Sequence, residues 1–154
     1  MRTASLALAV GALLVAAAPA AADIAPQHGI GGVRIGDTQA KVLKTRGTPV
    51  AIVNGSNDFG PYRELRYRGL TVTLQGRTRV TSVSTRSRAE RTRSGAGVGS
   101  TETALNLAVR GLTCETFGDV RSCTLGVQEA GRRVTVFFLS KGRVNRVVVG
   151  NVLD

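Results

Sequence analysis

The sequence has very few of the side chains on which enzymes and metal sites depend. It contains one histidine, His28, two cysteines and no tryptophan. A catalytic triad or a metal centre needs several activated groups close together. The acidic residues are scattered along the chain, and the glycine-rich segment Gly29–Gly36 lacks the Gly-Lys-Ser/Thr of a phosphate-binding loop. We therefore predict a protein that is not an enzyme, with no catalytic residue, metal or cofactor.

Aromatic side chains are also scarce, whereas basic ones are abundant. Aromatic residues make up 4% of the chain, and 21 Lys+Arg, most of them arginine, face 10 Asp+Glu, for a net charge of +11. Such a charge attracts anionic membranes, cell-envelope polymers or nucleic acid. Binding of single-stranded nucleic acid also needs aromatic stacking platforms, and Tyr62 and Tyr67 are too few to build one. We do not expect nucleic acid as a partner; a base composition that favours arginine codons explains the charge equally well.

Long apolar runs are absent except at the N-terminus. Residues 1–22 combine an early Arg2, a short apolar run and an alanine-rich exit, which is typical of a signal peptide. The run is too short to span a bilayer comfortably, and no second run follows. We expect cleavage before Asp23, giving a secreted, periplasmic or cell-envelope protein without a transmembrane segment; an uncleaved anchor is the alternative. No cysteine stands at the cleavage point, which excludes a lipoprotein anchor.

The two cysteines, Cys114 and Cys123, favour one disulfide bond. Disulfides form and persist in exported proteins, and these cysteines enclose only a short loop. A metal site would need further ligands, and His28 is the only histidine. A redox-active pair more often shows Cys-x-x-Cys spacing. We therefore predict that Cys114 and Cys123 are joined.

One short pattern occurs twice and predicts two helices. The first copy consists of Ile35, Gly36, Thr38 and Leu43, and the second of Val98, Gly99, Thr101 and Leu105. The two copies differ by one position at the leucine. A threonine at this place can accept hydrogen bonds from the first free amides of a helix. The predicted helices run from about residue 39 to 46 and from about 102 to 110. Leu43 and Leu105 are expected to be equivalent core residues.

Each predicted helix is followed by segments in which apolar and polar residues alternate, as in half-buried strands. Leu70–Gln75 and Val134–Leu139 show this period of two. We predict an α+β fold of two tandem repeats, each a helix plus an antiparallel meander, sharing a core with the helices on one face of the sheet. The predicted organisation is a signal peptide (1–22), a flexible N-terminal segment (23–32), repeat 1 (33–85), an Arg-rich linker (86–97) and repeat 2 (98–154).

The Ile-Gly-Asp-Thr turn at residues 35–38, the helix after it and the alternating segment Leu70–Gln75 resemble a known pattern. It is that of secreted β-lactamase inhibitory proteins and of the related small lipoproteins of the β-barrel assembly machinery. The resemblance covers about Val33–Val149 and implies a fold rather than a function. The segment Cys114–Cys123 also resembles a disulfide loop of the inhibitory proteins. Those proteins bind through an aromatic-rich concave sheet, whereas the outward positions here are Thr, Gln, Ser and Arg, so no contact residue carries over.

Two functions follow as hypotheses. The first is a secreted, non-enzymatic binding module that uses an open sheet face and loops to hold a secreted or envelope protein. Its candidate interface loop contains Glu115, Phe117, Asp119 and Arg121. The alternative is an electrostatic binder of anionic envelope polymer or lipid headgroups. Its candidate residues are Arg86, Arg88, Arg91 and Arg93, which equally fit a solvated linker. Binding to a polymer should weaken steeply with salt, whereas a shape-complementary interface should not.

Overall fold

The computed structural model describes residues 23–153, and the predicted signal peptide, residues 1–22, lies outside them. The described chain is mostly β, with 49% of residues in strands and 11% in two helices. The elements in chain order are β1 Ile24–Ala25, β2 Gly29–Ile30, β3 Val33–Arg34, α1 Gln39–Arg46, β4 Ala51–Asn57, β5 Gly60–Arg66, β6 Leu70–Gln75, β7 Ser82–Thr85, α2 Glu102–Ala108, β8 Leu112–Phe117, β9 Val120–Leu125, β10 Arg133–Ser140 and β11 Arg143–Asn151.

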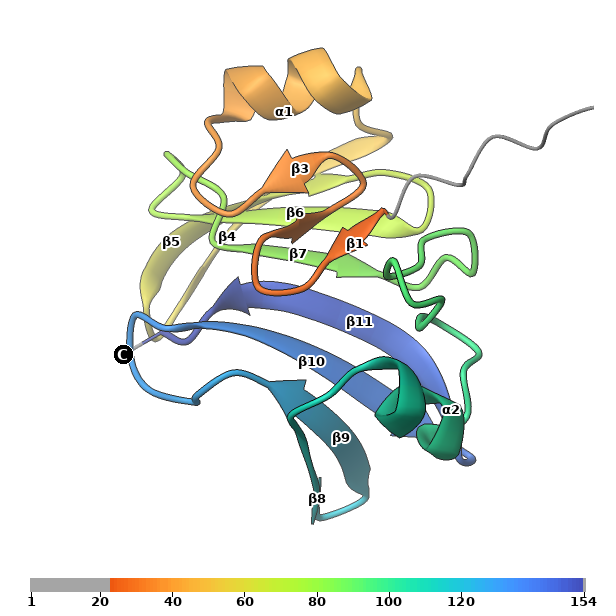
Figure 1. Cartoon of the computed structure of the whole chain (residues 1–154). Coiled ribbons are helices and arrows are strands. Elements are labelled where there is room, and N and C mark those ends of the chain that lie inside the picture. The colour runs from red at the N-terminus through yellow and green to blue at the C-terminus, as the bar shows by residue number, and fades with distance from the viewer. Residues whose placement is uncertain (1–22, 154) are drawn as a thin grey trace, which may run out of the picture.

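The predicted α+β class of helix-plus-meander repeats is therefore wrong. The protein is built on one eight-stranded antiparallel sheet and one small three-stranded sheet (Figure 1). The helices have only 8 and 7 residues, too few to form a layer of their own. The prediction gave them too much weight because their threonine caps are clear in the sequence, while several strands are too short to show a period.

The large sheet has the order β4-β5-β6-β7-β11-β10-β9-β8. The strands on each side of its centre follow one another through short turns, and the two halves meet where β7 pairs with β11. Val83 lies opposite Val149 at this junction, and both side chains are fully buried. The hydrogen bonds therefore run without a break across all eight strands, so the two halves share one sheet.

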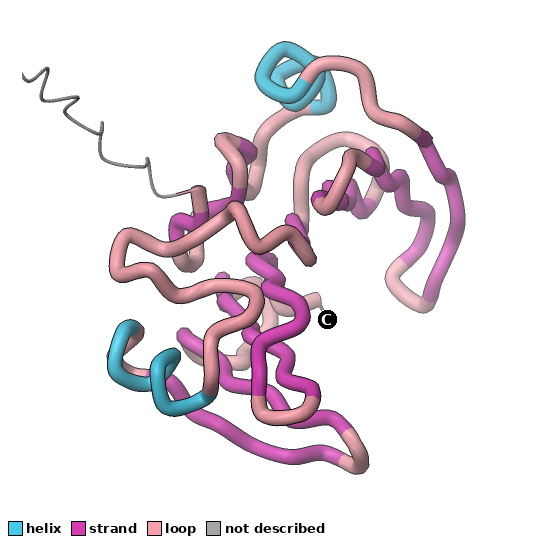
Figure 2. Tube along the Cα trace, turned by 90° about the vertical axis from the view of Figure 1, so that its right-hand side faces the viewer, coloured by secondary structure: helices cyan, strands magenta, loops and turns pink. Residues whose placement is uncertain are grey.

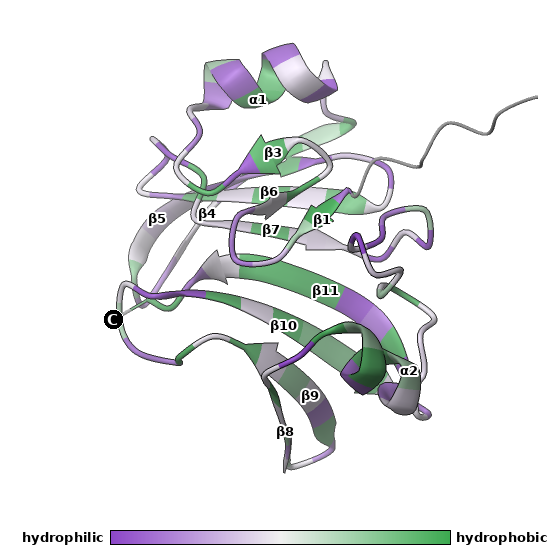
Figure 3. Cartoon of the chain, in the orientation of Figure 1, coloured by the Kyte–Doolittle hydropathy of each residue, from purple (hydrophilic) through white to green (hydrophobic). Residues whose placement is uncertain are grey.

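The core lies on one face of this sheet only. Figure 1 shows the small sheet and α2 in front of the large sheet, and Figure 2, turned by 90°, shows both helices on the same side. Alternate residues point toward them; Val72 and Phe137, for example, are fully buried, and strands β10 and β11 carry broad apolar stretches (Figure 3). Within the described residues, no helix or further strand covers the opposite face, which we call the uncovered face.

The N-terminal segment 23–32 is packed rather than loose, contrary to the prediction of a flexible segment. β1 pairs with β2, and β2 pairs with β3. Ile24 and Ile30 are each only 1% exposed and belong to the core cluster. Each of these strands has two residues, which is too short for an alternating pattern to be visible in the sequence.

The two helix starts share their local geometry. The Thr38 side chain accepts a hydrogen bond from the Lys41 amide, and Thr101 accepts one from the Ala104 amide. Glycines two residues before each threonine have φ values of 92° and 94°, in the left-handed region that favours glycine. These caps agree with the predicted helix starts, whereas the duplication of whole units stays a prediction.

The predicted pairing of helix positions needs a correction. Leu105 is fully buried, but Leu43 is only half-buried, and the buried residue of α1 is Val42. Val42 lies four residues after its capping threonine, as Leu105 does after Thr101. The side chain at this position faces the core in both helices because the caps set the phase of the helix.

The segment 86–97, predicted as a linker, is tied to the rest of the structure. The backbone oxygen of Arg91 accepts a hydrogen bond of 3.0 Å from the Ile24 amide. Glu90 is buried, and its carboxylate accepts a hydrogen bond from the Thr85 hydroxyl. Ala96 belongs to the core. These contacts hold the segment between the two halves of the large sheet and the small sheet.

Candidate binding site on the uncovered face

The disulfide between Cys114 and Cys123 is confirmed and lies across the β8–β9 hairpin. The two cysteines face each other in the strand register, with their Cα atoms 4.0 Å apart. Cys123 is fully buried against the core. The bond therefore fixes the outermost hairpin of the sheet, which carries the four residues of the predicted interface loop.

Those four residues do not form one surface. Glu115 and Phe117 alternate with Cys114 and so lie on the uncovered face, where the Phe117 side chain is 88% exposed. Asp119 is in the turn between the strands. Arg121 alternates the other way and contacts α2, so only part of the predicted loop is available to a partner.

Arg121 holds the hairpin to helix α2. Its guanidinium donates to both carboxylate oxygens of Glu102, at 2.5 Å from Nη2 and 3.2 Å from Nε. These hydrogen bonds lower the pKa of Glu102 and raise the pKa of Arg121, because they favour the charged form of each group. The geometry is that of a bidentate pair. Arg121 therefore positions the β8–β9 hairpin against α2.

The structure also separates the four arginines of the predicted anionic-partner site. Arg86, Arg88 and Arg93 are exposed, whereas Arg91 is half-buried. The Arg91 side chain donates to the backbone oxygens of Arg88 and Gly95 and to the Ser100 hydroxyl. The hydrogen bonds of Arg91 therefore stabilise the loop that contains it.

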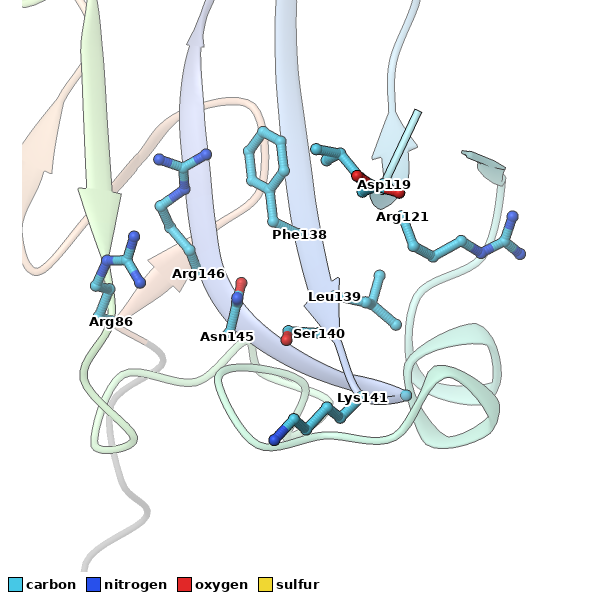
Figure 4. A pocket seen from close by; sticks show the side chains of 11 residues that line it. Arg86, Asp119, Arg121, Phe138, Leu139, Ser140, Lys141, Asn145 and Arg146 are labelled. Carbon is cyan, nitrogen blue, oxygen red and sulfur yellow. The ribbon is translucent and has the colours of Figure 1, made fainter. Parts of the chain in front are cut away.

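A hollow of about 440 Å³ opens on the uncovered face between the end of β7 and the β8–β9 turn. Figure 4 shows Phe138 and Arg146 side by side on neighbouring strands, with Arg86 beyond Arg146 and Asp119 beyond Phe138. The hollow is lined by Arg86, Asp119, Val120, Arg121, Phe138, Leu139, Ser140, Lys141, Gly142, Asn145 and Arg146. Only Arg86 among the predicted polymer-binding residues belongs to it.

Arg146 is the central charge of this hollow. It lies opposite Phe138 in the β10–β11 register, and its guanidinium carbon is 4.2 Å from the centroid of the Phe138 ring. This is a cation–π contact. Burial lowers the pKa of Arg146, and the positive charge of Arg86 lowers it further. The hollow is therefore lined by two cations that repel each other.

Neither cation forms an ion pair with a residue that the structure describes. Among residues 23–153, the three ion pairs are Lys41–Asp37, Arg66–Glu64 and Arg121–Glu102. The side chains of Arg86 and Arg146 make no hydrogen bond to any other described residue. A partly desolvated cation without a partner favours an anion. The hollow can therefore bind an anionic group, with a flat aromatic surface beside it.

The sequence prediction missed Phe138 and Arg146. Each stands at an outward position of an alternating strand, and an aromatic and a basic side chain at outward positions are a usable signal. The sequence does not show that these two residues lie opposite each other. Their pairing depends on the register between β10 and β11, where a bulge between Phe138 and Leu139 shifts the alignment.

Comparisons with known proteins give the fold but no family. A scan against protein families finds no match, and neither does a search of curated proteins. Among solved structures, the chain is similar to an extracellular protein containing an SCP domain from Bacillus anthracis, with a TM-score of 0.54 and 11% identity over 76% of this chain and 44% of that one. It is also similar to a DUF4309 family protein from Bacillus subtilis, with a TM-score of 0.52 and 17% identity over 84% of this chain and 88% of that one.

The two structures show that the fold occurs elsewhere, and at these identities they show the fold alone. The chain spans less than half the length of the SCP-domain protein. The predicted resemblance to β-lactamase inhibitory proteins and assembly lipoproteins stays a prediction. Between residues 23 and 153, neither helix has the length and apolar character needed to cross a bilayer.

Proposed function

We propose that this protein is a secreted, non-enzymatic binding module that holds a protein partner against the uncovered face and the tip of the β8–β9 hairpin. One observation carries the proposal. Within residues 23–153, the eight-stranded sheet is packed on one face only, and the uncovered face presents a hollow with two unpartnered arginines and an aromatic ring. Sites of this kind, with a few charged groups beside apolar surface, are typical of protein interfaces.

The exposed apolar residues near the hollow support a protein partner. Phe117 and Val120 face each other across the hairpin, and they are 88% and 50% exposed. Val120 also lines the hollow. Exposed apolar side chains next to charged ones suit a partner that buries both, and a partner that carries only charge would leave the apolar surface in water.

Export is part of the proposal. The disulfide supports an oxidising compartment, and one of the similar solved structures is described as an extracellular protein. The signal peptide at residues 1–22, the internal repeat and the resemblance to secreted inhibitory proteins are further parts of the hypothesis. An uncovered sheet face is also the surface through which that resemblance implies binding.

The alternative is an electrostatic binder of anionic envelope polymer or membrane surface. Its supporting observation is the net charge of +11. The geometry supports it less well, because Arg91 is engaged within its own loop and Arg66 on the uncovered face is paired with Glu64 at 2.7 Å. A polymer needs a continuous track of cations. The unpartnered cations near the hollow, Arg86 and Arg146, are confined to that one place.

Capture of proteins from culture fluid or envelope extract tests the proposal when matched variants are included. Ser84→Trp places a bulky ring at the centre of the uncovered face, and Thr45→Trp places the same ring on the exposed side of α1. We expect one protein to be captured by the parent and by Thr45→Trp, at low and at high salt, but not by Ser84→Trp. Equal capture by all three chains, or capture that disappears at high salt, contradicts the proposal.

A further inference from the structure

We propose that the hollow between β7, β10 and β11 binds a carboxylate side chain from an acidic segment of the partner protein. The carboxylate would lie between Arg86 and Arg146, beside the ring of Phe138. This inference rests on the proposed function and names the chemistry of the partner.

The charges of the hollow favour an anion. Burial and the charge of Arg86 both lower the pKa of Arg146, so the protonated guanidinium is held there at a cost. No carboxylate among residues 23–153 forms an ion pair with it. An anion placed between the two arginines removes this repulsion, and a partly desolvated site screens the attraction less than open water does.

The shape of the donor groups suits a carboxylate. A guanidinium is planar and presents a rigid fork of N–H groups that matches the two oxygens of a carboxylate. The guanidinium carbon of Arg146 lies over the ring of Phe138, 4.2 Å from the ring centroid. The N–H groups of Arg146 donate to no other residue among 23–153, so they stay available to a ligand. Asn145 and Ser140 also line the hollow and add neutral polar groups.

The surroundings of the two arginines favour a protein segment over a polyanion. Asp119 is the acidic residue in the lining of the hollow, on the side of Phe138 away from Arg146 (Figure 4). A chain of closely spaced phosphates would bring negative charge against Asp119. A protein segment can place a carboxylate at the arginines and an apolar side chain over Phe117 and Val120, which are exposed beside the hollow.

Direct binding of defined probes tests the inference. A fluorescent peptide of alternating glutamate and leucine is titrated with the protein at low salt, and the same peptide with glutamine in place of glutamate is the matched probe. We expect the glutamate peptide to bind at least tenfold more tightly than the glutamine peptide. Failure of the glutamate peptide to bind, or equal binding of both peptides, overturns the inference.

Variants locate the site. We expect Arg146→Gln and Arg86→Gln each to weaken binding of the glutamate peptide about tenfold. Arg146→Lys, which keeps the charge but not the planar fork of N–H donors, should lose less of the affinity for the glutamate peptide. Arg88→Gln, which removes an exposed charge outside the hollow, should change binding less than twofold. A loss with Arg88→Gln as large as with Arg146→Gln would mean that binding follows net charge, which contradicts a built site.

Polyphosphate and vesicles containing phosphatidylglycerol complete the experiment. Tighter binding of either probe than of the glutamate peptide, lost in Arg146→Gln, would identify a phosphate or headgroup site and overturn the carboxylate. The proposed function fails separately. If Ser84→Trp abolishes capture of the natural partner while Arg86→Gln and Arg146→Gln leave it intact, the uncovered face is the interface and the carboxylate inference alone is wrong.

Discussion

Arg146 and Phe138 face each other across the β10–β11 pair, with the guanidinium carbon 4.2 Å from the centroid of the ring. The contact is on the uncovered face, where both side chains are half-buried. It holds a cation over an aromatic ring, while the positive charge of Arg86, directly after β7, repels that cation. The fold therefore holds beside an aromatic ring a positive charge that has no ion-pair partner among residues 23–153, as we expect of a site that binds an anion.

The coupling between Arg146 and Phe138 should be measurable in the free energy of unfolding. We expect a double-mutant cycle with Arg146→Met and Phe138→Leu to give a coupling energy of about 0.5–1 kcal/mol in favour of the native pair. Urea unfolding of the four proteins provides the values. A coupling energy of zero would mean that the two side chains are neighbours without a net interaction, so that Phe138 does not hold Arg146 in place.

Burial of the helix residues predicts unequal effects on stability. Leu105→Ala should lower the free energy of unfolding by about 2–5 kcal/mol, because this side chain is fully buried. Leu43→Ala should lower it by less, since Leu43 is half-buried. Thr73→Ala on the uncovered face is the control and should change it by less than about 1 kcal/mol. Equal losses for Leu105→Ala and Thr73→Ala in chemical denaturation would show that the faces are assigned the wrong way round.

The Cys114–Cys123 bond should be fully formed in the exported protein. Intact mass after alkylation without reductant should show no modified thiol. Replacing both cysteines by alanine should lower the free energy of unfolding by about 2.5–3 kcal/mol, because the short loop is no longer closed in the unfolded chain. Alkylation of both cysteines in the unreduced protein would count against the disulfide and against the oxidising compartment.

The pair of Glu102 and Arg121 predicts a pH dependence. Hydrogen bonds from Arg121 hold the folded-state pKa of Glu102 below its ordinary value of 4.5. A depressed carboxyl pKa contributes stability above the unfolded-state pKa, and that stability is lost as the pH falls through the folded-state pKa. Unfolding of the parent and of Glu102→Gln should therefore differ near neutral pH and converge in acid. A difference that stays constant from neutral pH down to strongly acidic pH would show that the ion pair does not contribute.

The sequence predicted local features better than global ones. The threonine caps at Thr38 and Thr101 were recognisable because capping depends on neighbouring residues alone. The disulfide followed from the export signal and the spacing of the cysteines. The fold class was wrong because β1, β2 and β3 have two residues each and show no pattern, so the share of strand was underestimated.

The site was predictable only in part, for a related reason. Arg86 was identified from its place in a run of arginines, and the structure sets it apart from Arg91, which bonds within its own loop. Phe138 and Arg146, which line the hollow together with Arg86, stand on β10 and β11, more than fifty residues further along the chain. Their approach depends on strand order and register, which a sequence pattern of period two does not contain.

Site-specific photo-crosslinking tests the central claim, that the uncovered face binds a protein partner, most directly. A photoreactive side chain is placed at Thr73 or Ser84 on that face, and at Lys44 or Leu107 on the helices as matched controls. Each chain is exported by its native host and irradiated in the culture. The account predicts one crosslinked protein adduct from Thr73 and Ser84 and none from Lys44 and Leu107. Adducts from the helix positions alone, or equally from all four positions, would contradict it.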